Sequence, residues 1–531
     1  SKLGQQNGNI RINTQSLSMT SGSRLATNVS SEGQGARAGS VIITATGYIS
    51  IDGTLPNPQN ENLITTIFSG VEAGGAGQGG EIRLSAPSIA ITNGAAVISA
   101  TLGNGNAGNI SLNARDSITL DGLSRAGFAS GIFSAVGGQN NFGRGGDIAI
   151  ATSQLNVLNG AVIDASAGNF QSGGSITVRA DRFNALNGGQ IISTAIGAGR
   201  AGNIDLKISD QLVLAGRIDR RFDPLERDVI NNDEPGASGL FANSLPNTTG
   251  DSGSISVSAK RMRLQDGARI AVNSEGQGTG GSIRIQGDQL TLSNQSLISA
   301  ETLSTQGGNI TLNLAERLLL RRNSLISTTA GIAQAAGNGG NIQLNSPLIV
   351  AIASENSDIA ANAFTGRGGR IDVTAQGIFG IEAQARPTTR SDITATSQFG
   401  VSGTVTLNTI QVDPSRGLAE LPLEPVDSAN QIVQYCSPQA QATNSLTNIG
   451  RGGIPTNPSQ PLTPDSTIVP WVTLDPSAPS TTIKPPDLPE PIVEAQSIGR
   501  DRTGKLALLP HASTAQIQLS NLARSNCIAK Q

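Results

Sequence analysis

The chain has 531 residues, of which 14% are charged and 3% aromatic, and its formal net charge is −3 at pH 7. The chain has no run of basic residues, and its net charge is slightly negative. It therefore lacks the positively charged surface that is typical of proteins that bind nucleic acid or an anionic membrane. No apolar run approaches the ~18 residues of a membrane-spanning helix, and the scarcity of aromatic side chains argues against a bulky globular core.

A short phrase, glycine followed by one residue and then Ile or Val, recurs over the first four fifths of the chain. The commonest interval between phrases is 28 residues, and the longer intervals contain insertions. A fixed period of this length is the signature of a solenoid, and it overrides the several globular domains that length alone suggests. The glycines of the phrase are Gly8, Gly39, Gly80, Gly108, Gly146, Gly174, Gly202, Gly253, Gly281, Gly308, Gly340, Gly369 and Gly403.

The residue two positions after each of these glycines is always β-branched and apolar. Apolar and polar residues alternate around it, as in "NISLN" and "SIRIQ", with the period of a half-buried strand. Each unit therefore reads as three short strands, as in "NITLNLA", "RLLLRRN" and "SLISTTA". The residues expected to form one internal ladder are Ile10, Val41, Ile82, Ile110, Ile148, Ile176, Ile204, Ile255, Ile283, Ile310, Ile342, Ile371 and Val405.

Stacking these units in register predicts an all-β fold, a parallel β-helix of about 13 coils over residues 1–413, with like residues ~4.8 Å apart. A second set of isoleucines, ~17 to 18 residues after the glycine of six units, is expected to add another internal ladder. This set comprises Ile98, Ile163, Ile192, Ile270, Ile298 and Ile326.

Gly103, Gly105 and Gly108 have the spacing of a dinucleotide-binding turn. The same spacing recurs in residues 75–80 and 276–281, and three copies of a supposedly unique site argue against it. In a nucleotide site the last glycine opens a helix whose N-terminus holds the phosphate, whereas each copy here runs into an alternating strand. The glycines are therefore interpreted as corners of coils.

Glycine and the asparagine that often follows it suit such corners, because glycine adopts positive φ without steric cost and Asn tolerates turns. Stacked Asn side chains can also hydrogen-bond along the rod. The asparagines in question are Asn9, Asn109, Asn203, Asn309 and Asn341.

Two insertions interrupt the coils, a charged one at residues 216–236 and a shorter one at residues 54–62. Loops that project from a rigid scaffold often bind partners. Lengthening a solvated loop also costs little free energy, so a contact surface and a tolerated insertion both remain open.

Composition changes after about Asp413, and 16 of the 24 Pro residues lie from Pro414 onward. Proline lacks the N–H donor that stacked strands require, so the coils cannot continue. Residues 414–531 are expected to form an extended, partly disordered tail with one small ordered element.

The coil phrase "GGNITLNLAERLLLRRNSLIST" resembles the repeats of filamentous haemagglutinin-like exoproteins of the two-partner secretion pathway, particularly the cyanobacterial branch. In the tail, "IVQYC", "GRGGIPTNPSQPLTPDS" and "VPWVTL" look like the C-terminal signature of that branch. The resemblance covers nearly the whole chain. It implies a right-handed β-helix that is secreted through an outer-membrane barrel transporter, lies outside the cell or on its outer membrane, and attaches to surfaces, cells or glycans.

The N-terminal secretion domain of that family has no counterpart in these residues. The chain starts at Ser1 and enters a coil almost at once. Because a solenoid normally has an atypical capping unit at its end, we expect this chain to be a C-terminal fragment whose missing portion carries the cap, the secretion domain and any export signal.

Cys436 and Cys527 are the only two cysteines, and both lie in the tail. In an exported protein they are expected to form a disulfide that closes a loop of about 90 residues. Free or intermolecular thiols remain the alternative, because a sequence does not show whether two Cα atoms come within bridging distance. By the resemblance, such a loop could hold the exoprotein at its transporter.

Some β-helices are polysaccharide lyases or hydrolases, so a polysaccharide-acting enzyme is the alternative function. A hydrolase needs two carboxylates that face each other across a cleft. The acids of the coils occupy differing offsets from the coil glycine and are interpreted as solvated, so no catalytic residue is predicted. These acids include Asp116, Asp121, Asp147, Asp164 and Asp205.

The remaining motifs do not indicate a cofactor or a metal. His511 is the only histidine, and the two cysteines lack the spacing of a zinc site. The segment "GRDRTGKL", residues 499–506, departs from a phosphate loop because Leu506 replaces Ser or Thr and Pro510 would break a following helix.

Overall fold

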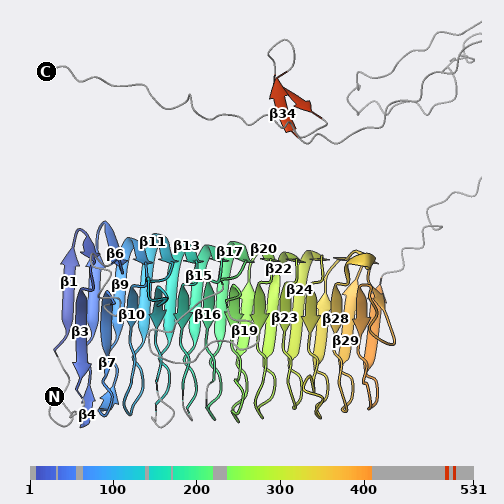
Figure 1. The fold of residues 1–531 in the computed structure, drawn as a ribbon, viewed down its shortest axis with the longest axis horizontal. Helices are drawn as coiled ribbons and strands as arrows, with labels where there is room; N and C mark the ends of the chain where they lie inside the picture. Colours follow the sequence, from blue (N-terminus) through green and yellow to red (C-terminus); the bar gives the residue numbers. More distant parts are fainter. Residues whose placement is uncertain are drawn as a thin grey trace, which may run out of the picture. The chain divides into compact units, whose positions relative to one another are not determined.

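The structure is a computed structural model that describes residues 8–30, 34–54, 64–137, 143–168, 171–195, 197–218, 236–409, 497–500 and 506–509. The chain divides into two compact units, Ser1–Glu420 and Leu421–Gln531. The first is a parallel β-solenoid of about 12 turns over residues 10–409, and its coils succeed one another in chain order (Figure 1). The predicted β-helix fold is confirmed.

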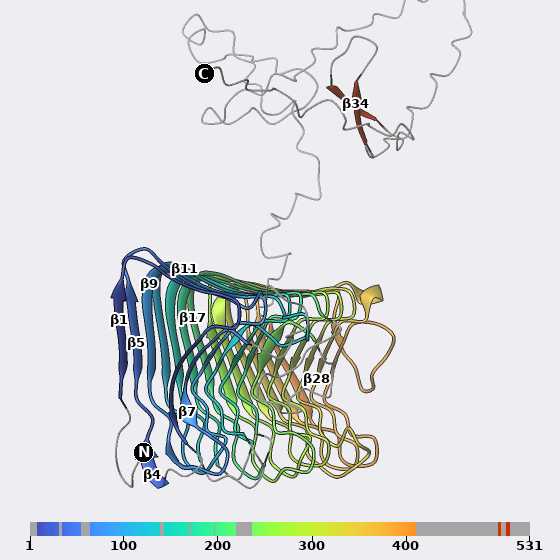
Figure 2. The same ribbon diagram turned by 60° about the vertical axis from the view of Figure 1, so that its left-hand side comes forward.

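Two sheets form the walls of the solenoid, and Figure 2 shows the coils turned so that their stacking is visible. The long-strand sheet has 18 strands. They are β1 (Ile10–Thr14), β2 (Leu17–Met19), β5 (Val41–Ala45), β6 (Tyr48–Asp52), β9 (Ile82–Thr92), β11 (Ile110–Asp121), β13 (Ile148–Leu158), β15 (Ile176–Leu186), β17 (Ile204–Ala215), β19 (Ser254–Ser258), β20 (Arg261–Gln265), β22 (Ser282–Ser293), β24 (Asn309–Leu320), β26 (Asn341–Asn345), β27 (Leu348–Val350), β29 (Arg370–Ala375), β30 (Gly377–Phe379) and β33 (Thr404–Thr409).

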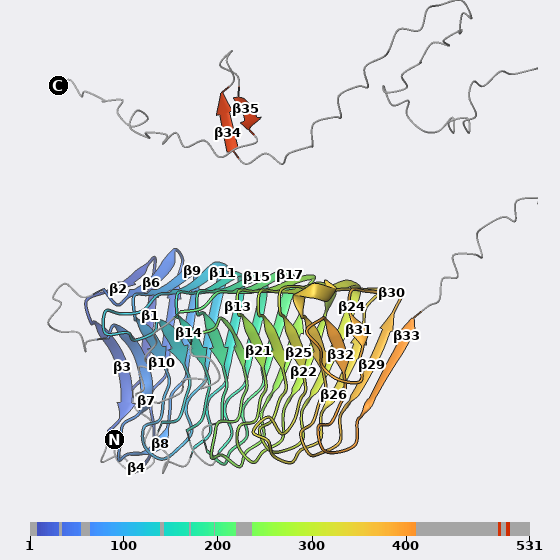
Figure 3. The same ribbon diagram turned by 45° about the vertical axis from the view of Figure 1, so that its right-hand side comes forward.

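The short-strand sheet has 13 strands, several of which lie side by side in Figure 3. They are β3 (Arg24–Val29), β7 (Thr66–Val71), β10 (Ala96–Ile98), β12 (Gly131–Phe133), β14 (Val162–Asp164), β16 (Gln190–Ile192), β18 (Gly239–Phe241), β21 (Arg269–Ala271), β23 (Leu297–Ser299), β25 (Leu325–Ser327), β28 (Asp358–Ala360), β31 (Glu382–Ala383) and β32 (Asp392–Thr394). A small separate pairing joins β4 (Gln34–Arg37) to β8 (Ala76–Gln78).

The prediction of about 13 coils agrees with the described solenoid to within one turn. Each of the 13 glycine phrases does open a strand of the long-strand sheet. The last of these strands, β33, ends at Thr409, and the residues that follow it lie outside the described part until Ser497. The described solenoid therefore has about 12 turns.

The expected division of each coil into three short strands is only partly correct. In the central coils the first two segments form one continuous strand of 11 or 12 residues, such as β15 and β24. Within β15 the inward residues Ala180 and Phe183 are separated by two successive outward residues, Asp181 and Arg182. At this corner two successive side chains point outward, which interrupts the inward–outward alternation once. The backbone can bend there without ending the strand.

The predicted ladder after the coil glycines is confirmed. Backbone pairing joins every member to its counterpart in the next coil, from Ile10 with Val41 to Ile371 with Val405. All members from Val41 to Ile371 are at most 1% exposed. Burial of this stack supplies a large part of the apolar contact that a single coil could not make alone.

The prediction of a second isoleucine ladder is wrong at two of its six positions. Ile163, Ile270, Ile298 and Ile326 point into the core, whereas Ile98 and Ile192 belong to a separate apolar cluster. Their neighbours Val97 and Ile191 occupy the inward position instead. Because alternate residues of a strand face opposite sides, a shift of one residue moves a side chain from the core to the outer face.

The coil glycines are required for a reason that differs from the predicted one. None of those in the described coils from Gly80 to Gly403 has a positive φ. An added Cβ at Gly174 or Gly281 would instead lie only 2.0 or 1.9 Å from the carbonyl oxygen of the equivalent glycine one coil earlier. The triplet Gly103, Gly105 and Gly108 follows the same rule, since each would meet a glycine oxygen of the preceding coil.

Positive φ values occur at a different corner, between the long-strand and short-strand sheets. Asn187 and Gly188 there have φ values of 50° and 84°, and Asn159 and Gly160 repeat the pattern one coil earlier. Two successive positive φ values define the tight turn that Asn-Gly favours. The Asn187 amide donates a 3.0 Å hydrogen bond to Asn159 Oδ1, which makes an asparagine ladder.

Most of the asparagines that follow the coil glycines do not form the predicted stack of side chains. Asn341 does donate to Asn309 Oδ1 at 2.9 Å, as expected of a stack. The side-chain oxygens of Asn9, Asn109 and Asn203 instead accept the backbone N–H of a residue in the next coil.

In the second unit the described residues form one antiparallel hairpin, β34 (Ser497–Arg500) and β35 (Leu506–Leu509). This hairpin is the small ordered element expected in the tail. A strand opens at Leu506, so the segment "GRDRTGKL" is not followed by the helix that a phosphate loop needs.

We predict that Gly281→Ala destabilises the solenoid by about 1–3 kcal/mol, because the methyl group cannot fit beside the Gly253 carbonyl without moving a coil. The measurement is the urea midpoint of the full chain, followed by far-UV circular dichroism. Gly8→Ala is the matched control, because Gly8 opens the same phrase yet has no neighbour within 4 Å of an added Cβ. Equal midpoints for the two variants would contradict the close-approach explanation.

Candidate functional site

The short-strand sheet carries a second set of side chains on its outer face. In each three-residue strand the middle residue faces the core, and the first and third residues face outward. Between β7 and β21 the outward residues are mostly apolar and form their own cluster. Phe133 and Phe241 in this cluster are only 1% and 3% exposed.

Both insertions leave the solenoid beside this apolar cluster. Ile64, which follows the shorter insertion, packs against it, and Ala237, which follows the larger one, belongs to it. Arg217 and Ala237 form an antiparallel bridge, and Ile218 N donates to the Gly236 oxygen at 2.9 Å. The two ends of the larger insertion therefore lie side by side where it leaves and rejoins the solenoid, as expected of a loop. Residues 219–235 lie outside the described part.

From β21 onward the outer face of the same sheet becomes polar. Ser299 and Ser327, which face outward, are only 0% and 1% exposed, so neighbouring segments cover them. Two clefts lie along this face, and Ile332 lines both of them. We call these two clefts together the groove.

The smaller cleft has a volume of about 210 Å³ and contains charged side chains from two successive coils. Its walls include Arg269, Glu275 and Glu301, together with Asn273. The hydroxyl of Ser327, in the next coil, donates to the Glu301 carboxylate. These acids were not predicted from the sequence, although Asn273 and Glu301 are separated by the 28-residue period that would have stacked them.

The larger cleft has a volume of about 680 Å³, and neutral polar and apolar residues line most of it. Asn362, Thr396 and Gln398 supply polar groups, and Phe364 supplies a ring. The Phe364 ring packs edge-to-face against Phe399, with 5.0 Å between centroids, and the Phe399 side chain is 69% exposed. An aromatic pair of this kind beside amides and hydroxyls is typical of a ligand site.

The polar row along the groove is held by bonds between coils. Asn273 Oδ1 accepts the Glu301 backbone N–H at 2.9 Å, and Asn362 Oδ1 accepts that of Thr396 at 2.8 Å. Each side chain therefore secures the coil that follows it. The groove is consequently a preformed surface whose polar groups repeat at the spacing of the strands, ~4.8 Å.

The five aspartates weighed as catalytic candidates do not converge on one site. Asp116 pairs with Arg115 at 2.8 Å, Asp121 accepts from the Asn159 amide, and Asp147 accepts the Ser175 backbone N–H. Asp205 lies 3.7 Å from the Lys207 amine. The expectation of a solvated side chain is wrong for Asp164, which is 2% exposed and accepts the Ser166 backbone N–H at 2.7 Å.

Another acidic pair arises from stacking between coils. Asp358 and Asp392 open β28 and β32, so the repeated phrase "SDI" places them in adjacent coils. Burial raises the pKa of Asp358, even though the Asp392 backbone N–H donates to its carboxylate at 2.9 Å. Asp392 is 2% exposed. The Asp358 carboxylate therefore joins two coils, whereas the Asp392 carboxylate accepts the backbone N–H of Thr388 in its own loop.

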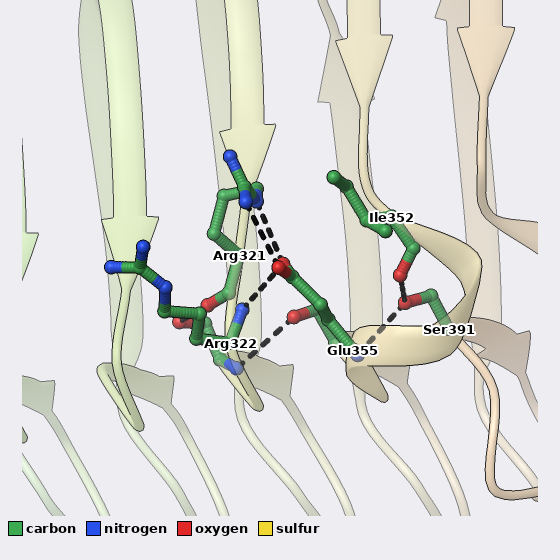
Figure 4. A network of polar contacts seen from close by, with 7 residues as sticks. Arg321, Arg322, Ile352, Glu355 and Ser391 are labelled. Carbon is green, nitrogen blue, oxygen red and sulfur yellow. Dashed lines mark hydrogen bonds and ion pairs between the residues drawn. The ribbon is translucent and has the colours of Figure 1, made fainter. Parts of the chain in front are cut away.

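A third polar cluster stabilises the corner where the short helix η1 (Ala353–Glu355) replaces a turn (Figure 4). Arg321 donates two hydrogen bonds to the Glu355 carboxylate, at 2.7 and 2.9 Å, and the Arg322 backbone N–H donates a third at 2.9 Å. Ser391 Oγ donates to the Ile352 oxygen at 2.8 Å. The network joins three successive coils, and within it the Glu355 carboxylate is paired with the Arg321 guanidinium group.

The two cysteines and the histidine of the tail, Cys436, Cys527 and His511, lie outside the described residues, so the disulfide remains a prediction. Among the described residues, no three His, Cys, Asp or Glu side chains gather in a way that could hold a metal ion. The described part of the chain also contains no helix with the length and apolar character needed to cross a membrane.

Comparison with known proteins identifies no relative: no family model, no curated protein and no solved structure matches the chain.

We predict that Glu355→Gln lowers the free energy of unfolding by about 1 kcal/mol at pH 7, a modest value because the Glu355 and Arg321 side chains are 21% and 33% exposed. The hydrogen bonds from Arg321 lower the pKa of Glu355 from 4.5 to about 2. The stabilisation is therefore complete above about pH 4.5 and is lost as the pH falls toward 2.

Denaturant titrations of the wild type and Glu355→Gln between pH 7 and pH 2 measure this difference. The two curves should converge on the acid side. Asp116→Asn is the control, because its carboxylate is 56% exposed and its ion pair should contribute little. A difference between wild type and Glu355→Gln that does not change with pH would contradict the assigned cause.

Proposed function

We propose that the chain is a rigid attachment rod and that the groove on the outer face of its short-strand sheet binds glycan chains. The observation that carries this proposal is the larger cleft, where the Phe364 ring, packed against the exposed Phe399, stands beside amide and hydroxyl groups. Sugars offer apolar ring faces and hydroxyls together, so they suit a surface of this mixed character. The solenoid core holds these groups in place without a moving part.

A glycan suits the groove better than an extended peptide does. Peptides commonly bind to β proteins by adding a strand to a free sheet edge. The floor strands β23, β25 and β28 are each paired on both sides, so they offer no such edge. Recognition must then come from side chains, which repeat along the groove at ~4.8 Å, a step similar to the length of one sugar ring.

The resemblance to filamentous haemagglutinin-like exoproteins supports the same proposal from the sequence. On this view the protein is exported by two-partner secretion, passes an outer-membrane barrel transporter and acts outside the cell or on its outer membrane. Its role there is structural and adhesive, and it does not catalyse a reaction.

A polysaccharide-acting enzyme remains the second candidate, and one observation favours it. Glu275 and Glu301 line the same small cleft, as the two carboxylates of a glycoside hydrolase would. Against this, the Glu301 carboxylate already accepts a hydrogen bond from Ser327 Oγ, and Arg269 shares the cleft. A carboxylate held in this way by the scaffold is less free to transfer a proton to a substrate.

We predict that the full chain binds neutral or acidic oligosaccharides weakly, and that Phe399→Ala reduces the affinity about 3- to 10-fold through loss of ring contact. Isothermal titration calorimetry with a defined oligosaccharide panel measures this effect. Phe379→Ala is the matched control, because Phe379 is also highly exposed, at 59%, but lies on β30 in the long-strand sheet, away from the cleft. Equal affinities for both variants and the wild type would contradict binding in the larger cleft.

The same oligosaccharides separate attachment from catalysis. Incubation with the wild type should release no shorter products. If products appear and Glu275→Gln or Glu301→Gln abolishes them, the enzyme assignment replaces the adhesive one.

For the tail we predict a disulfide between Cys436 and Cys527 in the exported protein, which would stabilise the loop by roughly 4 to 5 kcal/mol on chain-entropy arguments. Non-reducing peptide mapping should recover the two cysteines in one linked peptide pair. Recovery of both as alkylated free thiols would falsify the pairing. If the loop holds the protein at its transporter, Cys436→Ser should also move protein from the cell surface into the medium.

A further inference from the structure

We propose that the larger cleft recognises the end of an acidic glycan, with Arg386 binding a carboxylate on the terminal sugar. This inference rests on the proposed function and specifies the ligand of the same site. It follows from two features of the cleft, the segment that closes one end of it and the charge of its walls.

We infer that the cleft is closed on the side of the last coils, from the position of the segment that follows the last strand of the sheet. The additional strand β31 pairs with β32 and forms the last strand of the short-strand sheet. The chain then continues through Ala385, Arg386 and Pro387, which line the cleft, before it returns to β32. In the other direction the cleft meets the smaller one at Ile332, so a chain could extend toward the earlier coils.

Arg386 is the only charged side chain among the described residues that line the larger cleft. Within the described ranges it takes part in no ion pair and no side-chain hydrogen bond, unlike Arg321 with Glu355 or Arg261 with Asp210. The nearby acids Glu382 and Asp392 line a separate, small cavity of about 20 Å³ together with Arg390. The guanidinium group therefore keeps its donors for a ligand.

The chemistry of this group selects the ligand class. The planar guanidinium presents a fork of N–H donors that matches a carboxylate with two parallel hydrogen bonds. Asn362 and Gln398 beside it can bond sugar hydroxyls, and Phe364 can contact a ring face. Because the loop blocks further extension, the carboxylate should belong to the last sugar of the chain.

The test uses the full chain and three tetrasaccharides: one with a single terminal uronic acid, one with the uronic acid at an internal position and one fully neutral. Wild type should bind the terminal-acid ligand roughly 10- to 100-fold more tightly than the others, as charge-assisted hydrogen bonds would give. Arg386→Gln should remove this preference, so that the terminal-acid ligand binds no more tightly than the neutral one. Arg284→Gln is the control, since Arg284 is exposed on β22 in the long-strand sheet.

The outcomes distinguish failure of the inference from failure of the proposed function. Equal binding of all three ligands, or no effect of Arg386→Gln, overturns recognition of an acidic end while glycan attachment stands. Tight binding of the internal acid overturns the closed end. If no oligosaccharide binds and an acidic tetrapeptide does, the proposed function itself fails.

Discussion

The close approach of successive coils is the constraint on which the rest of the structure depends. At the strand-opening position the backbone of one coil lies against the glycine carbonyl of the coil before it, and an added Cβ would come within about 2 Å of that oxygen. In the described coils from Gly80 onward, only glycine leaves room for this close approach. The residue two positions later must then point inward, which is why isoleucine or valine occupies that position and stacks into a continuous ladder.

Because the core is fixed by this repeat, variation is confined to the outer faces. The outward residues of the short-strand sheet change from Phe68, Phe133 and Phe241 in early coils to Ser299, Ser327 and Asp358 in later ones. Such a change does not disturb the core, since first and third residues of these strands face away from it. One solenoid can therefore carry an apolar face and a polar groove on the same sheet.

The core was predictable from the sequence, whereas the groove was not. A single period of 28 residues identified the ladder from Ile82 to Ile371. It could not identify which of two adjacent residues in a three-residue strand faces inward, and Ile98 and Ile192 were therefore misplaced. Groove residues such as Glu301, Asn362 and Arg386 come from several coils and one loop, and periodicity alone gives no reason to group them.

The proposed binding function agrees with the way in which the floor of the groove is built. Asn273 and Asn362 each use the side-chain oxygen to hold the backbone of the next coil, so rotation of these groups would break contacts that join coils. A catalytic acid or base must exchange protons and adjust to the transition state. Side chains tied into the scaffold are better suited to hold a ligand in one geometry. In the proposed function, the remaining groups on the walls select the ligand, and because they lie outside the core they can change without loss of the fold.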